Sequence, residues 1–225
     1  METSLHRQLK EFYCGNAAAH EVRVGEFRID AIVEGQLIEI QQAALGALKR
    51  KVPELLQQHE VVVVKPLAAH KTIVRRDRAG GPMISRRVSP RHETLLDLFQ
   101  ELVSFVDVFP HPRLTVEVLL TEQEEERIKI RRRKRWAKDY RIADRRLVGV
   151  FSRHVLRTAA DLQGLLPGDT PETFTTADVA RLARIPRWLA QKMLYCLRQT
   201  GGVVACGKQG RSSAYRRTQL TRDAA

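Results

Sequence analysis

Residues 28–41 read RIDAIVEGQLIEIQ and predict two short β-strands around a tight turn. Apolar and polar residues alternate on both sides of Glu34-Gly35, which is the pattern of a half-buried hairpin with a two-residue loop. One face of this hairpin is apolar, and the other face is polar. The register expected for this loop pairs Val33 with Gln36, Asp30 with Glu39, and Arg28 with Gln41.

The polar face of the hairpin places two carboxylates side by side. Directly opposed residues have Cβ atoms roughly 4.5–5.5 Å apart, and like charges at that spacing repel each other. A divalent cation such as Mg²⁺ would cancel the repulsion, because hard cations prefer oxygen ligands. Asp30 and Glu39 are therefore candidate metal ligands. The alternative is an outer face on which both carboxylates lie in water.

Length and charge bound the class of protein. A chain of 225 residues has room for one large or two small domains, and 43% hydrophobic residues can build a core. The formal net charge of +13 favours polyanionic partners. Nucleic acid is the first such partner to consider, and an anionic membrane surface is the second.

The cysteines and the N-terminus favour a reducing compartment. The chain has three cysteines, an odd number, and no CxxC pair, so we expect neither a disulfide framework nor a zinc site. Residues 1–13 lack the apolar run of a secretory signal. The longest purely apolar run, Val61–Val64, is too short to span a bilayer. We therefore expect a cytoplasmic protein without a membrane partner.

Hydrophobic periodicity predicts an α/β order in the first half of the chain. The residues before the hairpin suggest a helix and a strand, and those after it a helix and further strands. The expected elements are helices at 4–13, 42–59 and 93–107, strands at 21–28, 61–67, 71–76 and 114–120, and a loop at 77–92 that carries four arginines.

A basic segment follows these elements. Residues 127–146 contain eleven Lys or Arg and two acids. Arg131, Arg132 and Arg133 are candidate contacts to nucleic-acid phosphates. Trp136 and Tyr140 lie among the charges, where aromatic rings can stack on bases or pack against the protein. The alternative for the whole segment is a solvated strand pair or loop.

The C-terminal residues resemble a winged helix-turn-helix over residues 173–218. A short helix at 177–184, a helix at 187–199, and strands at 203–206 and 213–217 carry the resemblance. It implies that the second helix enters the major groove and that the hairpin contacts the backbone or minor groove. Such folds also mediate protein–protein contacts, but residues 171–225 hold ten Lys or Arg and three acids, a net of 10 − 3 = +7. The candidate DNA contacts are Arg187, Gln191, Lys192 and Tyr195 on the helix, and Lys208 and Arg211 on the wing.

Residues 4–76 resemble the PD-(D/E)XK nuclease superfamily, through their order of elements and the pattern Asp30-x8-Glu39-x-Gln41. The resemblance implies a restriction-endonuclease-like fold, with a mixed central sheet flanked by helices. It also implies that Asp30 and Glu39 bind Mg²⁺ or Mn²⁺, which activates water for attack on a phosphodiester. Gln41 stands where the family usually has lysine, and an amide supplies no positive charge.

The same resemblance leaves two roles open. The upstream glutamate of the family corresponds to Glu21, in the preceding strand, or to Glu11, on the first helix. The missing charge could come from Lys65 or Arg28, each of which could instead be a surface cation. The chain is also similar to uncharacterised bacterial proteins that join such a domain to a C-terminal winged helix, through LIEIQ at 37–41 and KMLYCLR at 192–198.

We therefore predict a nuclease-like α/β domain at 1–126, a basic connecting region and linker at 127–170, and a winged helix-turn-helix domain at 171–225. The predicted function is Mg²⁺-dependent endonucleolytic cleavage of DNA, with the winged helix docking the duplex. A homodimer would suit duplex cleavage. The alternative is a non-catalytic DNA-binding protein or regulator on a degenerate nuclease scaffold, and a third reading is an RNA-directed enzyme or binder.

Overall fold

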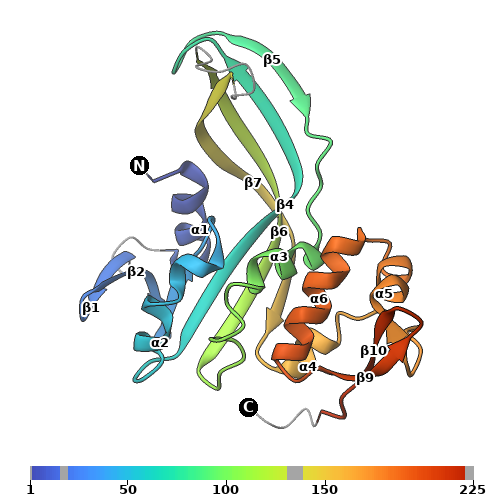
Figure 1. The fold of residues 1–225 in the computed structure, drawn as a ribbon. Helices are drawn as coiled ribbons and strands as arrows, with labels where there is room; N and C mark the ends of the chain where they lie inside the picture. Colours follow the sequence, from blue (N-terminus) through green and yellow to red (C-terminus); the bar gives the residue numbers. More distant parts are fainter. Residues whose placement is uncertain (1, 16–19, 131–138, 221–225) are drawn as a thin grey trace. The chain divides into compact units, whose positions relative to one another are not determined.

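The computed structural model describes residues 2–15, 20–130 and 139–220. In these residues the chain is mixed α/β, and helices flank a large central sheet (Figure 1). Seven strands form this sheet in the order β1-β2-β3-β4-β6-β7, with β5 pairing with β4. The strands are β1 (His20–Val24), β2 (Phe27–Val33), β3 (Gln36–Ile40), β4 (Val61–Arg76), β5 (Met83–Val88), β6 (Leu114–Lys129) and β7 (Tyr140–Leu156).

The central sheet is mixed in direction. Antiparallel pairing joins β1 to β2, β2 to β3, and β4 to β5. In contrast, β4 and β6 run the same way. The N–H of Val61 bonds to the carbonyl of Arg113, and the Thr121 hydroxyl bonds to the carbonyl of Leu67, so residue numbers rise together along the two strands. Parallel neighbours are buried on both faces, which explains why every residue from 61 to 68 is buried.

The chain divides into two compact units, and neither is continuous in sequence. The strands β4, β6 and β7 each contribute residues to both units. The predicted linker at 167–171 lies inside the second unit, and residues 139–154 of the predicted connecting region lie in the first. The first unit comprises residues 1–42, 64–94 and 119–154, and the second comprises 43–63, 95–118 and 155–225.

The hairpin of β2 and β3 has the predicted register. Val33 lies opposite Gln36, so the loop is Glu34-Gly35, and both residues have positive φ, 50° and 82°. Positive φ at both central residues is the type I′ arrangement that matches the twist of paired strands. The predicted apolar face is buried at Ile29, Ala31, Ile38 and Ile40.

Several predicted boundaries were wrong. The strands expected at 61–67 and 71–76 are one strand, β4, and the loop expected at 77–92 contains β5. The helix expected at 42–59 is a 3₁₀ turn, η2 (Leu45–Leu48), followed by a short helix, α2 (Lys51–Leu55). Pro53 lies in the first turn of α2, where a backbone N–H makes no helical hydrogen bond, so its absence in proline costs nothing. The helix expected at 93–107 is η3 (Leu95–Asp97) and α3 (Leu98–Leu102).

Helix α1 (Ser4–Cys14) packs against β2 and β3 in the first unit. Thr3 caps its N-terminus, and Gly15, with φ of 59°, ends it. The Gln8 amide accepts from the N–H of Leu147 and donates to the carbonyl of the same residue, so it satisfies both backbone groups of one β7 residue. Within the described residues no helix is long and apolar enough to cross a membrane.

The C-terminal elements form a small α/β group in the second unit. The sheet order is β8-β10-β9, and both pairings are antiparallel. The predicted long helix is confirmed as α6, which buries Leu189, Met193 and Leu197 and contacts α3 and α5. The elements are α4 (Ala159–Gln163), β8 (Phe174–Thr175), α5 (Thr176–Leu182), α6 (Arg187–Gln199), β9 (Val203–Gln209) and β10 (Ser212–Arg217).

We predict that Thr175→Ala lowers the free energy of unfolding by about 1 kcal/mol, the usual cost of losing a helix N-cap. Thr175 Oγ1 accepts from the N–H of Asp178, and the Asp178 carboxylate accepts from the N–H of Thr175, so α5 begins with a reciprocal capping box. Urea unfolding followed by circular dichroism measures the change. The control is Thr173→Ala at an exposed position; equal losses in the two variants would contradict the capping role.

The backbone N–H of Thr175 also holds the pKa of Asp178 below its ordinary value of 3.8. A carboxylate with a depressed pKa contributes stability above the unfolded-state pKa, and that stability is lost as the pH falls through the folded-state pKa. We therefore expect Asp178→Asn to be less stable than the wild type at pH 7. The difference should begin to shrink below about pH 4, where the carboxylate of the unfolded state protonates, and should be lost once the pH falls below the folded-state pKa. A difference that is independent of pH would contradict this account.

Candidate functional site

Asp30 lies in an open polar pocket of the first unit, with a volume of about 370 Å³. Its Oδ2 accepts from the backbone N–H of Ile40 at 2.7 Å, and its Oδ1 lies 2.8 Å from Nε2 of His6 on α1. The carboxylate thus joins β2 to β3 and to α1. The pocket is lined by Glu2, Thr3, His6, Glu21, Arg28, Asp30 and Gln42.

Ion pairs engage the two glutamates that line this pocket. Lys10, which is only 3% exposed, lies 2.6 Å from Glu2 and 3.0 Å from Glu21. Arg28 pairs with the other oxygen of Glu21. The predicted upstream carboxylate Glu21 therefore binds two cations of the protein, while the alternative, Glu11, is exposed on α1.

The structure separates the environments of the two predicted metal ligands. Glu39 is buried, with 9% of its surface exposed, and is not among the residues that line the Asp30 pocket. Gln41 donates its backbone N–H to the carbonyl of Val64 on β4. Lys65 on β4 is 3% exposed, and its Nζ lies 3.4 Å from the carbonyl of Gln42. Glu39 is therefore not on a solvated face, whereas the Asp30 side chain keeps 18% of its surface exposed in the open pocket.

This arrangement does not match a divalent-metal site. Among residues 2–15, 20–130 and 139–220, no three His, Cys, Asp or Glu side chains come together in a way that could hold a metal ion. At Asp30, a backbone N–H and an imidazole approach the two oxygens that Mg²⁺ would use. The β2–β3 register sets Asp30 opposite Glu39, as expected, but only Asp30 lines the pocket, so metal binding by this pair stays a prediction. His6, which the sequence did not single out, is the partner of Asp30.

A groove in the second unit collects residues that the sequence predicted to contact DNA. It has a volume of about 310 Å³ and lies between α6 and the β9–β10 hairpin. Three arginines line it, and no acid does. The lining residues are Thr176, Arg187, Gln191, Leu194, Tyr195, Arg198, Arg211, Ser212, Ser213 and Tyr215.

Helical spacing explains which α6 residues reach the groove. Arg187, Gln191, Tyr195 and Arg198 are separated by four, four and three residues, so they form one stripe on the helix. Arg198 was not among the predicted contacts, although the same spacing would have identified it. The opposite stripe of α6 is buried.

The other predicted DNA contacts lie outside this groove. Lys192 places its Nζ 5.6 Å from the centre of the Trp188 ring, where a cation–π interaction holds it. Lys208 is exposed on β9, opposite Ser213. The three predicted phosphate contacts Arg131, Arg132 and Arg133 lie outside the described residues.

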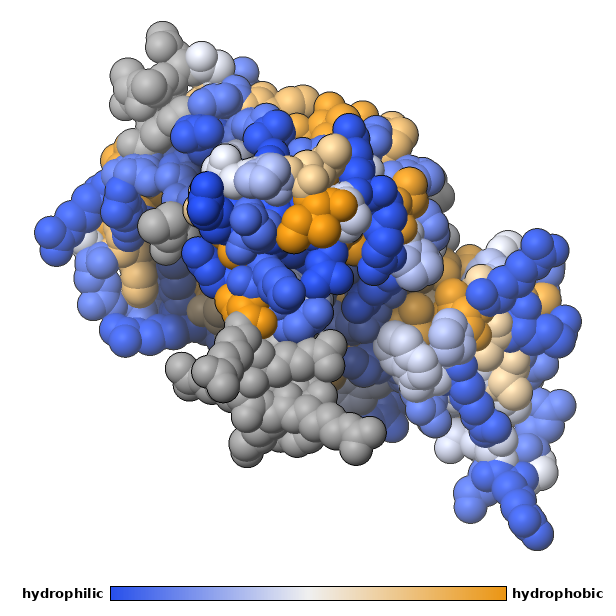
Figure 2. All heavy atoms as spheres, turned by 90° about the horizontal axis from the view of Figure 1, so that it is seen from above, coloured by the Kyte–Doolittle hydropathy of each residue, from blue (hydrophilic) through white to orange (hydrophobic). Residues whose placement is uncertain are grey.

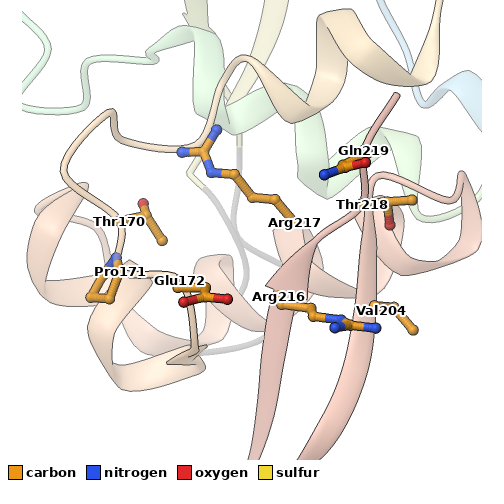
Figure 3. A pocket seen from close by; sticks show the side chains of 8 residues that line it. All are labelled: Thr170, Pro171, Glu172, Val204, Arg216, Arg217, Thr218 and Gln219. Atoms are coloured by element: carbon orange, nitrogen blue, oxygen red, sulfur yellow. The ribbon is translucent and has the colours of Figure 1, made fainter. Parts of the chain in front are cut away.

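A larger cavity of about 590 Å³ lies beside the ends of β9 and β10 (Figure 3). Arg217 reaches across it and donates to the carbonyl of Pro167, which ties residues 167–172 to β10. Arg216 extends toward Val204, and Glu172 lies on the opposite wall. Because an acid lines this cavity together with the arginines, it lacks the uniform positive charge of the α6 groove.

Comparison with known proteins gives a family and a relative. Residues 3–157 match the family model described as "Domain of unknown function (DUF8091)". An uncharacterized protein of Treponema pallidum (strain Nichols) is 28% identical over 217 residues, which cover 96% of this chain and 85% of that protein. No solved structure matches the chain. The family match includes Asp30 and all of its pocket lining except Glu2, and it ends before α4. The match to the Treponema protein extends over the C-terminal elements.

We predict that Asp30→Ala lowers the free energy of unfolding by about 1–3 kcal/mol, because the N–H of Ile40 loses its acceptor. Asp30→Asn should cost less, since the amide oxygen still accepts from Ile40. Urea unfolding measures both changes. Glu11→Ala, at an exposed position on α1, is the matched control and should change stability by no more than about 0.5 kcal/mol. If all three variants unfold alike, the carboxylate does not link the strands and helix as described.

Proposed function

The chain belongs to the family described as a domain of unknown function (DUF8091), which names no activity, and we propose that it binds double-stranded DNA. The proposed binding surface is the groove between α6 and the β9–β10 hairpin. The observation that carries this proposal is a groove with three arginines, Gln191 and Tyr195 and with no acid in its lining. Arginine donates bidentate hydrogen bonds to phosphate or guanine, and glutamine can do the same to adenine.

The order of the C-terminal elements supports a winged helix-turn-helix. A helix, a short strand, two helices and a hairpin follow one another, and the short strand pairs with the last strand of the hairpin. In such a module the second of the two successive helices, here α6, enters the major groove. The β9–β10 hairpin is the wing, with Lys208 and Arg211 positioned for the DNA backbone.

Packing and charge favour DNA over a protein partner for this face. Six residues of α6 are buried inside the unit, and the helix contacts α3 and α5 there. The stripe that borders the groove is mainly polar, and the exposed Trp188 is not among the residues that line it. The net charge of +7 over residues 171–225 adds long-range attraction to a polyanion. An acidic protein surface could use the same charge, but it would not offer the regular spacing of phosphates that arginines on successive turns can follow.

Metal-dependent cleavage stays a prediction from the PD-(D/E)XK resemblance. Two features support it as a second function. The elements α1, β1, β2, β3, α2 and β4 follow the order expected for that fold, with strand order β1-β2-β3-β4, and Asp30 and Glu39 lie on adjacent strands. The contacts of Asp30 and the amide of Gln41 weigh against it, so DNA binding without cleavage is the function that the geometry favours.

We predict that Arg187→Ala combined with Arg211→Ala weakens duplex binding and its dependence on salt. Each phosphate contact contributes about −0.9 to the slope of log K against log salt concentration, so losing both contacts should reduce the slope by about 1.8. Fluorescence anisotropy with a labelled 30-base-pair duplex, over a series of KCl concentrations, measures it. Arg23→Ala, on β1, is the control for loss of an exposed arginine. An unchanged slope in the double variant would overturn the proposed function.

Cleavage is tested separately with supercoiled plasmid in Mg²⁺ or Mn²⁺. Because the groove carries the proposal, we expect bound plasmid to remain intact with either metal. If the wild type nicks the plasmid and neither Asp30→Asn nor Glu39→Gln does, the nuclease function is established instead. Asp30→Asn is preferable to Asp30→Ala here, because it preserves the bond from Ile40.

A further inference from the structure

The β4–β5 hairpin presents a strand that nothing covers among the described residues. All six residues of β5 are exposed, on both faces of the strand, and within residues 2–15, 20–130 and 139–220 its one strand partner is β4. Three of them are large and apolar: Met83, Ile84 and Val88 are 56%, 57% and 63% exposed. A strand exposed on both faces and along one edge is suited to an external partner, since it gains little from burial in its own chain.

The hairpin of β6 and β7 lies beside this strand pair in the first unit (Figure 1). Arg75, near the end of β4, lies 3.0 Å from Asp139, and Arg76 lies 2.8 Å from Glu126. Arg86 on β5 lies 3.3 Å from Glu124. These pairs bind the two hairpins together and engage three acids near the tip. Asp77, in the β4–β5 turn, is exposed and accepts from the backbone N–H of Arg78.

A further acid on β6 is also fully engaged. Glu125 is buried, and burial by itself would raise its pKa. Hydrogen bonds from Arg127 and Arg145 outweigh that effect and hold the pKa of Glu125 below its ordinary value. The carboxylate is therefore ionised and neutralised inside the sheet, where it cannot offset charge at the surface.

Exposed cations remain after this internal pairing. Arg78 in the β4–β5 turn, Arg87 on β5, Lys129 at the end of β6 and Arg141 near the start of β7 have no acidic partner within the described part of the chain. Viewed from above, as in Figure 2, this end of the molecule is largely hydrophilic, with isolated apolar side chains between. The surface is a basic one with apolar residues interspersed.

We propose that the β4–β5 hairpin is a second nucleic-acid contact, which lies in a groove of a duplex with Arg78 and Arg87 on the phosphates. β5 is an exposed strand that pairs with β4 of the central sheet, and DNA-binding proteins can place strands of a ribbon or sheet in a groove. Exposed apolar residues such as Met83 and Ile84 suit contact with bases, where apolar side chains meet thymine methyl groups or wedge between steps.

Charge disfavours the simplest competing occupant, a second copy of this strand. Residues 83–88 read MISRRV, with two arginines and no acid. Antiparallel pairing of two such strands would bring arginines from both copies close together, and like charges across a strand pair repel. A polyanion relieves that repulsion, and the net charge of +13 on the whole chain points the same way.

The inference extends beyond the α6 groove and does not require that groove to bind DNA. The test uses the full chain, the labelled 30-base-pair duplex and the KCl series. Arg78→Ala combined with Arg87→Ala is expected to reduce the salt slope by about 1.8, which corresponds to two lost phosphate contacts. The matched control, Arg7→Ala combined with Arg23→Ala, removes two exposed arginines from α1 and β1 and should leave the slope unchanged.

Each other outcome has a defined meaning. If the double variant binds the duplex with the slope of the control, the proposal is overturned. If it changes the oligomeric state measured by light scattering, or loses affinity for polyglutamate but not for DNA, a second copy or an acidic protein is the partner and the proposal also falls. If Arg78→Ala with Arg87→Ala lowers the salt slope while Arg187→Ala with Arg211→Ala does not, the β4–β5 hairpin contacts DNA and the proposed function of the α6 groove is overturned. Thermal unfolding of each variant confirms that it is folded.

Discussion

The two-residue turn at Glu34-Gly35 is the constraint on which the first unit depends. Side chains alternate between the faces of a strand, so a shift of one residue in pairing would move every side chain to the opposite face. Positive φ at both turn residues fixes Val33 opposite Gln36, and the register then sends Ile29, Ala31, Ile38 and Ile40 into the core. The same register puts Asp30 on the face that α1 covers, where it meets His6.

The carboxylate of Asp30 is a structural link in this arrangement, whatever else it does. It accepts from the N–H of Ile40 on the neighbouring strand and lies within hydrogen-bond distance of α1. A half-buried carboxylate is tolerated when donors surround it, since its desolvation is then offset. Lys10, buried between Glu2 and Glu21, follows the same rule nearby. The charges that suggested a catalytic centre also hold a helix onto a sheet.

Local sequence patterns predicted which elements form more accurately than they predicted where those elements begin and end. The hairpin and α6 were predicted correctly, because turn chemistry and helical spacing act between neighbours in sequence. Strand β4 was read as two strands and β5 as a loop. Residues 68–72 lack alternation, and the glycines and prolines at 80–90 are typical of loops. Pairing between β4 and β5 overrides both the missing alternation and the loop-like composition, because the neighbouring strand supplies the hydrogen bonds of the ladder.

The sequence by itself determined the α/β class, the hairpin register and the stripe Arg187, Gln191 and Tyr195 on α6. It named Asp30 but could not give its partner, because His6 is 24 residues away and no local spacing connects them. Only the tertiary structure decided that Glu39 is buried and does not line the Asp30 pocket. It also decided which arginines of the β4–β5 hairpin form ion pairs (Arg75, Arg76 and Arg86) and which are exposed (Arg78 and Arg87). Sequence records which charges exist, but their neutralisation depends on distances between strands that only packing sets.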